Sequence, residues 1–75
     1  MTKSIYSKEY SEFAKKLKSA RMEAGLTQIE VAKKFKKTQS YISKSEAGEQ
    51  RLDIVEVKKF ANLYGKDINF FMPKK

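Results

Sequence analysis

The chain contains neither cysteine nor histidine among its 75 residues. The first absence excludes disulfide bridges and thiolate zinc sites, and the second removes the commonest general base of enzymes. The chain also lacks a run of eighteen apolar residues, the length that a membrane-spanning helix needs, and its first residues have no apolar stretch of signal-peptide length. We therefore expect a cytoplasmic protein without disulfides, without a cofactor or metal ion, and without a membrane partner.

Acidic residues are scarce as well. Nine Asp and Glu stand against seventeen Lys and Arg, which leaves a formal charge of +8. A small domain with such an excess favours a polyanionic partner, most often nucleic acid, although the same charge can serve solubility alone. Seventy-five residues are enough for one domain, which buries only about 60% of its unfolded surface and has a modest core.

Nothing in the sequence has the alternating pattern of a strand followed by a hairpin turn. The first segment instead repeats its apolar residues every three or four positions, which predicts an amphipathic helix that Ser7 caps and Gly25 ends. Its apolar positions are Tyr6, Tyr10, Phe13, Leu17, Ala20 and Ala24.

Two short helices with a tight turn between them are predicted from Thr27 to Gly48. Thr27 and Glu30 have the spacing of a capping box, in which each side chain bonds the other's backbone N–H. The apolar residues of this helix, Val31, Ala32 and Phe35, fall on one side. Thr38 offers a second N-cap, and Gly48 a C-terminal glycine.

The last third of the chain predicts two more helices. Asp53 and Glu56 form another capping-box pair, and Gly65 ends the helix that they begin. Its apolar stripe consists of Ile54, Val57, Phe60, Ala61 and Tyr64. A final short helix from Ile68 to Met72 is terminated by Pro73. We expect a compact five-helix, all-α domain over residues 7–72, a disordered stretch at residues 1–6 and a basic tail at residues 73–75.

The segment from Thr27 to Gly48 resembles the helix-turn-helix of the phage-repressor (Cro/repressor, or xenobiotic response element) family of DNA-binding domains. The similarity covers roughly residues 13–72, and the helix-turn-helix falls on the second and third helices. The matching positions are Gln28, Val31, Ala32, Thr38, Gln39, Ser40, Ile42, Ser43, Glu46, Gly48, Arg51, Leu52 and Asp53.

Three residues depart from the family pattern. Lys36 stands where the family often has a turn glycine, Lys37 where it usually has an apolar residue, and Ser45 where a large apolar residue is common. A non-glycine residue at positive φ costs about 1–2 kcal/mol. A lysine can lay its methylene stem on apolar surface and keep its ammonium in water. Ser45 implies either a smaller core contact or an exposed site.

The resemblance implies a sequence-specific regulator that reads double-stranded DNA with its third helix. The face that would enter the major groove carries Gln39, Ser40, Ser43 and Lys44, with Thr38 at the cap. Glutamine can bond an adenine with two hydrogen bonds, lysine can donate to guanine, and serine can donate or accept. The competing interpretation is that these glutamine, serine and lysine side chains only solvate an exposed helix and do not contact DNA.

Contacts to phosphate are expected from Gln28, Thr38, Lys36, Lys37 and Arg51. Gln28 opens a helix, where free N–H groups favour an anion, and the resemblance makes it a phosphate clamp that also braces Gln39. For the lysines and the arginine, solvation is the competing interpretation. Tyr41 either packs partly buried or stacks on a sugar or a thymine methyl.

The resemblance also pairs Arg21, late in the first helix, with Glu46, near the end of the third. Such a pair would fix the third helix against the first; two independent surface charges are the competing interpretation. The aromatic residues Phe13, Phe35, Phe60, Tyr64, Phe70 and Phe71 are assigned to the core. The C-terminal segment with Phe70, Phe71 and Met72 has two possible roles. It either completes the core or forms an exposed apolar patch that pairs two subunits. We expect a weak homodimer through this patch, Ile68, Phe70, Phe71 and Met72, on an inverted-repeat operator.

The leading function is a DNA-binding transcriptional regulator, expected to repress by occupying its operator. The alternative is a protein-binding module of the same fold, such as a toxin-neutralising antitoxin. An enzyme has little support, because the sequence has no histidine, cysteine or glycine-rich phosphate loop and no evident carboxylate pair. The sequence does not indicate whether a small ligand regulates the protein.

Overall fold

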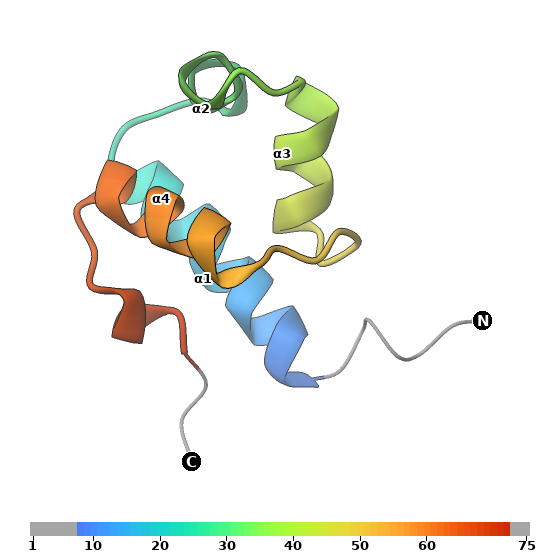
Figure 1. Cartoon of the computed structure of the whole chain (residues 1–75), viewed down its shortest axis with the longest axis vertical. Coiled ribbons are helices and arrows are strands. Elements are labelled where there is room, and N and C mark those ends of the chain that lie inside the picture. Colours follow the sequence, from blue (N-terminus) through green and yellow to red (C-terminus); the bar gives the residue numbers. More distant parts are fainter. Residues whose placement is uncertain (1–7, 73–75) are drawn as a thin grey trace.

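The computed structural model describes residues 8–72, which contain four α-helices, one turn of 3-10 helix and no strand (Figure 1). The elements are α1 (Lys8–Glu23), α2 (Gln28–Phe35), α3 (Gln39–Glu46), α4 (Ile54–Tyr64) and the 3-10 turn η2 (Ile68–Phe70). The all-α prediction is confirmed for this range, whereas the expected fifth helix is only the η2 turn. The predictions for residues 1–7 and 73–75 lie outside the described residues.

Both predicted capping boxes are present. The Thr27 hydroxyl accepts from the Glu30 N–H at 3.1 Å, and the Glu30 carboxylate accepts from the Thr27 N–H at 2.8 Å. Asp53 and Glu56 make the same reciprocal bonds at the start of α4. These bonds satisfy backbone donors that have no partner inside the helix, so the first residues of α2 and α4 are fixed by local chemistry.

Lys36 ends α2 in the left-handed conformation, with φ 57° and ψ 43°. The next N–H, that of Lys37, donates to the Ala32 carbonyl at 2.9 Å and closes the C-terminal turn of the helix. Gly48 has the same role after α3, at φ 78°. The prediction that a lysine replaces the turn glycine of α2 at positive φ is therefore confirmed.

The core lies where α1, α3 and α4 meet, with the inner face of α2 against it. Its fully buried members include Leu17, Val31, Ile42, Phe60 and Phe71. Aromatic rings connect the elements edge to face, with centroids 4.7 Å apart for Phe35 and Phe60 and 5.9 Å apart for Phe13 and Phe71. Ser45, left open as core or surface, is completely buried, and its hydroxyl donates to the Tyr41 carbonyl at 2.8 Å.

Phe71 contradicts the expected dimer patch, because it is only 1% exposed and packs in the core. The other patch residues, Ile68, Phe70 and Met72, are half-buried against the same core. Of the two predicted roles, the C-terminal segment therefore has the first: it completes the core and does not form an exposed patch. The apolar stripe predicted for α4 is wrong at Ile54, which is 60% exposed, because an apolar residue at the right helical angle is buried only where another element covers it.

Candidate nucleic-acid interface

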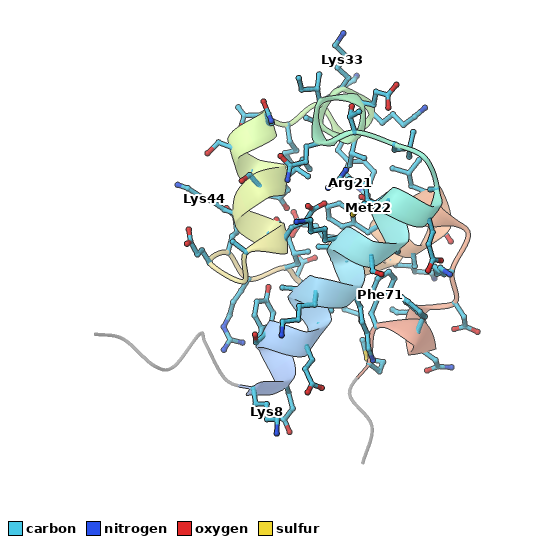
Figure 2. All side chains as sticks on the ribbon, turned by 180° about the vertical axis from the view of Figure 1, so that it is seen from behind. Lys8, Arg21, Met22, Lys33, Lys44 and Phe71 are labelled. Atoms are coloured by element: carbon cyan, nitrogen blue, oxygen red, sulfur yellow. The ribbon has the colours of Figure 1, made fainter. Side chains whose placement is uncertain are left out.

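Helix α3 has a buried side and an exposed side. Ile42 and Ser45 face the core, and the residues between them along the helix face outward. The predicted base-contact residues Gln39, Ser40, Ser43 and Lys44 are all exposed, as is Thr38 at the cap. The Thr38 hydroxyl accepts from the Tyr41 N–H at 3.0 Å, which fixes the first turn. Figure 2 shows Lys44 projecting outward from α3.

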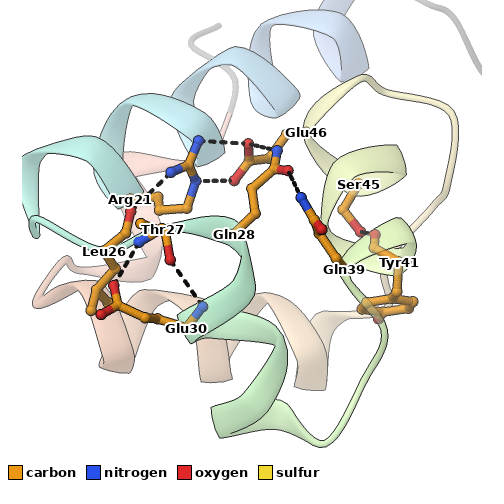
Figure 3. Close-up of polar contacts among 9 residues, drawn as sticks. All are labelled: Arg21, Leu26, Thr27, Gln28, Glu30, Gln39, Tyr41, Ser45 and Glu46. Carbon is orange, nitrogen blue, oxygen red and sulfur yellow. Dashed lines mark hydrogen bonds and ion pairs between the residues drawn. The ribbon is translucent and has the colours of Figure 1, made fainter.

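The structure brings Arg21 and Glu46 together in an ion pair between α1 and α3 (Figure 3). Arg21 Nε donates to Glu46 Oε2 at 2.6 Å, and Nη2 donates to Oε1 at 3.2 Å. Nη1 of the same guanidinium donates to the Leu26 carbonyl at 2.9 Å. The Arg21 side chain is 11% exposed and that of Glu46 is 3% exposed. Such a two-pronged pair in a nearly dry setting fixes the distance and the angle between the two helices.

Gln28 extends this pair to the exposed end of α3. Its Nε2 donates to Glu46 Oε1 at 3.0 Å, and its Oε1 accepts from Gln39 Nε2 at 3.3 Å (Figure 3). The chain of contacts therefore runs from a buried guanidinium to the first residue of α3. The hydrogen bond from Gln39 to Gln28 orients the amide of Gln39, although the Gln39 side chain is exposed.

Lys36, Lys37 and Arg51, the other candidates for phosphate contacts, are exposed. The Lys37 ammonium lies 4.9 Å from the centroid of the Tyr41 ring, and the Arg51 guanidinium lies 5.0 Å from that of Tyr10. Lys37 thus rests against an aromatic face, which explains why a lysine is tolerated where the family usually has an apolar residue.

Tyr10 braces the connection between α3 and α4, a role that the sequence did not reveal. Its hydroxyl donates to the Gln50 carbonyl at 2.6 Å and accepts from the Leu52 N–H at 3.1 Å. Burial raises the pKa of the Tyr10 hydroxyl above its ordinary value. This brace holds the loop that carries Arg51 against α1. No local pattern indicates a contact across forty residues.

Tyr64 lies next to the Arg21–Glu46 ion pair, and its ring is part of the core, as predicted. Its hydroxyl is buried and has no hydrogen-bond partner among the described residues. Burial raises the pKa of this hydroxyl, and the negative charge of Glu46 raises it further. Tyr64 therefore adds no charge beside Glu46 at neutral pH.

Two kinds of feature are absent from residues 8–72. No helix there is long and apolar enough to cross a membrane. In the same range no three potential metal ligands of the His, Cys, Asp or Glu type lie together.

Comparison with known proteins places this arrangement in a family. The helix-turn-helix family model HTH_3, of the Cro/C1 type, matches residues 17–71, which include α2, α3, α4 and the Arg21–Glu46 pair. A search of curated proteins found no match to the chain. Because the family model covers most of the chain, the protein belongs to the Cro/C1-type helix-turn-helix family, whose members are DNA-binding transcription regulators.

Proposed function

We propose that this protein binds specific double-stranded DNA sites and represses transcription by occupying them. The observation that carries the proposal is the outer face of α3, on which Gln39, Ser40, Ser43 and Lys44 are exposed while a buried ion pair holds the helix in place. A helix presented in this way fits the major groove, where amide and ammonium groups distinguish bases by their hydrogen-bonding edges. The fixed amide of Gln39 is suited to an adenine.

Contacts to phosphate complete the proposed interface. We propose that Gln28, at the first turn of α2, bonds a phosphate while its side chain orients Gln39. Thr38, Lys36, Lys37 and Arg51 are the other proposed phosphate contacts, and all four are exposed. The formal charge of +8 supports a large electrostatic share of the affinity.

Strong discrimination against a genome of competing sites requires more than one helix in one groove, so we propose that two copies bind together. With Phe71 buried, the best contact is the first turn of α4, where Ile54 is 60% exposed and Val55 is 59% exposed. Beside it lies a hollow of ≈ 330 Å³ whose lining includes Glu9 and Arg51. An exposed apolar patch of this kind suits two-fold pairing, in which the same residues of the two copies meet.

Selection of bound sites from random duplex DNA tests the proposal. We expect an inverted repeat whose half-site centres lie about 10 base pairs apart, matching successive major grooves about 34 Å apart. Gln39→Ala should relax the preference at one position of each half-site. Selection of no consensus would overturn sequence-specific binding, and an unchanged consensus with Gln39→Ala would remove that residue from the reading face.

A second measurement tests the dimer contact. Val55→Asp should lower the cooperativity of binding to the inverted repeat, because it places charge in the apolar contact, while the affinity for an isolated half-site changes little. Asn62→Asp is the matched control, since it adds the same charge at an exposed position of the same helix. Equal cooperativity in the two variants would remove this face from the dimer.

A further inference from the structure

A second hollow lies between the α2–α3 turn and α4, with a volume of ≈ 330 Å³. Three aromatic rings form its apolar part. Phe60 is buried, Phe35 and Tyr41 are half-buried, and the Phe35 and Phe60 rings meet edge to face at 4.7 Å. Its size is at the lower end of that of small-molecule pockets, which are lined mainly by apolar and aromatic side chains.

The rest of the lining is strongly basic. It consists of Lys34, Lys36, Lys37, Lys59 and a single carboxylate, Glu56, which together carry a formal charge of +3. Within residues 8–72 the ion pairs are Arg21–Glu46 and Lys66–Glu23, so none of these four lysines is paired with a carboxylate there. Four ammonium groups around the three aromatic rings favour a ligand that carries negative charge.

The Glu56 carboxylate is already engaged by the fold. Its Oε1 accepts from the Asp53 N–H at 3.4 Å as part of the capping box of α4. Burial and a hydrogen bond to Glu56 raise the pKa of Tyr41 to about 12, so the Tyr41 hydroxyl is neutral at physiological pH. The other titratable groups that line the hollow are the four lysines. Glu56 is thus the one negative charge of the lining.

We propose that this hollow binds a small anion that carries an aromatic ring, such as an aryl phosphate, sulfonate or carboxylate. The ring would pack against Phe35 and Tyr41, and the anionic group would lie among the lysine ammonium groups. DNA backbone is the less suitable occupant, because phosphate contacts use exposed cations and have no need of an aromatic cavity. A ligand that joins an aromatic ring to an anionic group would contact both the aromatic rings and the lysines of the hollow.

The position of the hollow gives the ligand a regulatory consequence, which rests on the proposed DNA-binding function. Lys36 and Lys37 belong to the turn that leads directly into Thr38, the N-cap of α3. A bound anion would neutralise two of the proposed phosphate contacts, so it would lower DNA affinity and make the salt dependence less steep. Binding of the ligand itself requires no DNA.

The test is a titration of the ¹⁵N-labelled full-length protein with phenyl phosphate, followed by amide chemical shifts. Inorganic phosphate and phenol are the controls, since each carries only one half of the ligand. We expect saturable shifts at Phe35 to Tyr41 and at Lys59 and Phe60, with binding at least about tenfold tighter than for either control. Equal binding of inorganic phosphate would overturn the proposal, because the lysines would then hold any anion.

Two variants distinguish binding in the hollow from the non-specific attraction of an anion to a basic protein. Lys59→Gln should weaken phenyl phosphate about fivefold, the expected effect of one partly solvated charge. Lys58→Gln removes the same charge from the neighbouring exposed residue, which does not line the hollow, and should have little effect. Similar losses in both variants would overturn the proposal. So would shifts at these amides with duplex DNA and none with phenyl phosphate, which would assign the hollow to DNA.

Discussion

The side-chain amide of Gln28 donates to Glu46 Oε1 at 3.0 Å and links the start of α2 to the end of α3. The same carboxylate takes two further hydrogen bonds from Arg21. The Glu46 side chain is only 3% exposed, so these donors replace the water that its carboxylate loses on burial. Glu46 is therefore the point on which the first three helices converge.

Arg21→Ala should destabilise the domain by about 3–5 kcal/mol, because it leaves the buried Glu46 charge with one neutral donor in place of the guanidinium. Urea unfolding measures the change. Lys66→Ala is the control, since it breaks the exposed pair with Glu23 and should cost less than about 1 kcal/mol. Equal losses in the two variants would show that the Arg21–Glu46 pair is no more important than a surface pair.

Lys36→Gly should stabilise the domain by about 1 kcal/mol, because glycine adopts φ 57° without the strain that lysine suffers there, less the entropy that glycine loses on folding. For a domain of this size the melting temperature should rise by about 4–8 °C. Lys34→Gly is the control, since it makes the same replacement inside α2, where glycine should lower the stability of the domain by about 1 kcal/mol. A loss of stability with Lys36→Gly would mean that its side chain contributes more than the strain costs.

Lys44→Ala should cost about 1–3 kcal/mol on the preferred DNA site and relax base preference at one position, as expected for a group that donates to a base edge. Gln28→Ala should weaken random DNA, because its proposed partner is a phosphate, and should weaken the preferred site further, because Gln39 loses the group that orients it. Competition binding with both kinds of duplex measures the two ratios. A uniform loss with Lys44→Ala would place that ammonium on the backbone.

The affinity for DNA should fall steeply with salt, with a slope of log K against log salt of about −0.9 for each neutralised phosphate. Lys37→Gln should make the slope shallower by about 1, if its ammonium leaves the Tyr41 ring for a phosphate. Lys58→Gln has the same change of net charge outside the proposed interface and serves as the reference. Identical slopes in the two variants would exclude Lys37 from the contacts.

Tyr41 should make stability depend on alkaline pH. The fold raises its pKa from 10.0 to about 12, so the native state prefers the protonated hydroxyl and the unfolded chain loses that proton first. The contribution is complete below pH 10 and is lost as the pH rises through 12. Melting temperatures measured across this window should fall less for Tyr41→Phe than for the unchanged protein. Parallel curves would show that Tyr41 titrates normally.

Local chemistry explains which parts of the fold the sequence could predict. The capping boxes at Thr27 and Asp53 depend on residues three apart, so their pattern is visible before any tertiary contact is known. The positive φ of Lys36 follows from its place directly after α2. The pairing of Arg21 with Glu46 came from family resemblance, because nothing in the spacing of two distant charges reveals a contact.

The errors fall where burial depends on neighbours. The segment with Phe71 is a single turn, too short for periodicity to define an inner face, and only the packed structure shows that this ring is in the core. Ile54 has the correct helical angle in α4, yet it lies at the first residue of the helix and is exposed. The Tyr10 brace and the basic aromatic hollow both join segments far apart in sequence, so no local pattern could predict them.

The two sides of α3 have a consequence for how the domain can diverge. Ile42, Ser45 and Glu46 connect the helix to the rest of the fold, whereas Ser40, Ser43 and Lys44 lie on its exposed side. Surface substitutions usually change stability by less than about 0.5 kcal/mol. The outer residues can therefore be exchanged one at a time while the scaffold stays folded. Under the proposed function, stability and target preference therefore depend on separate residues, and the domain can acquire a new binding site while it stays folded.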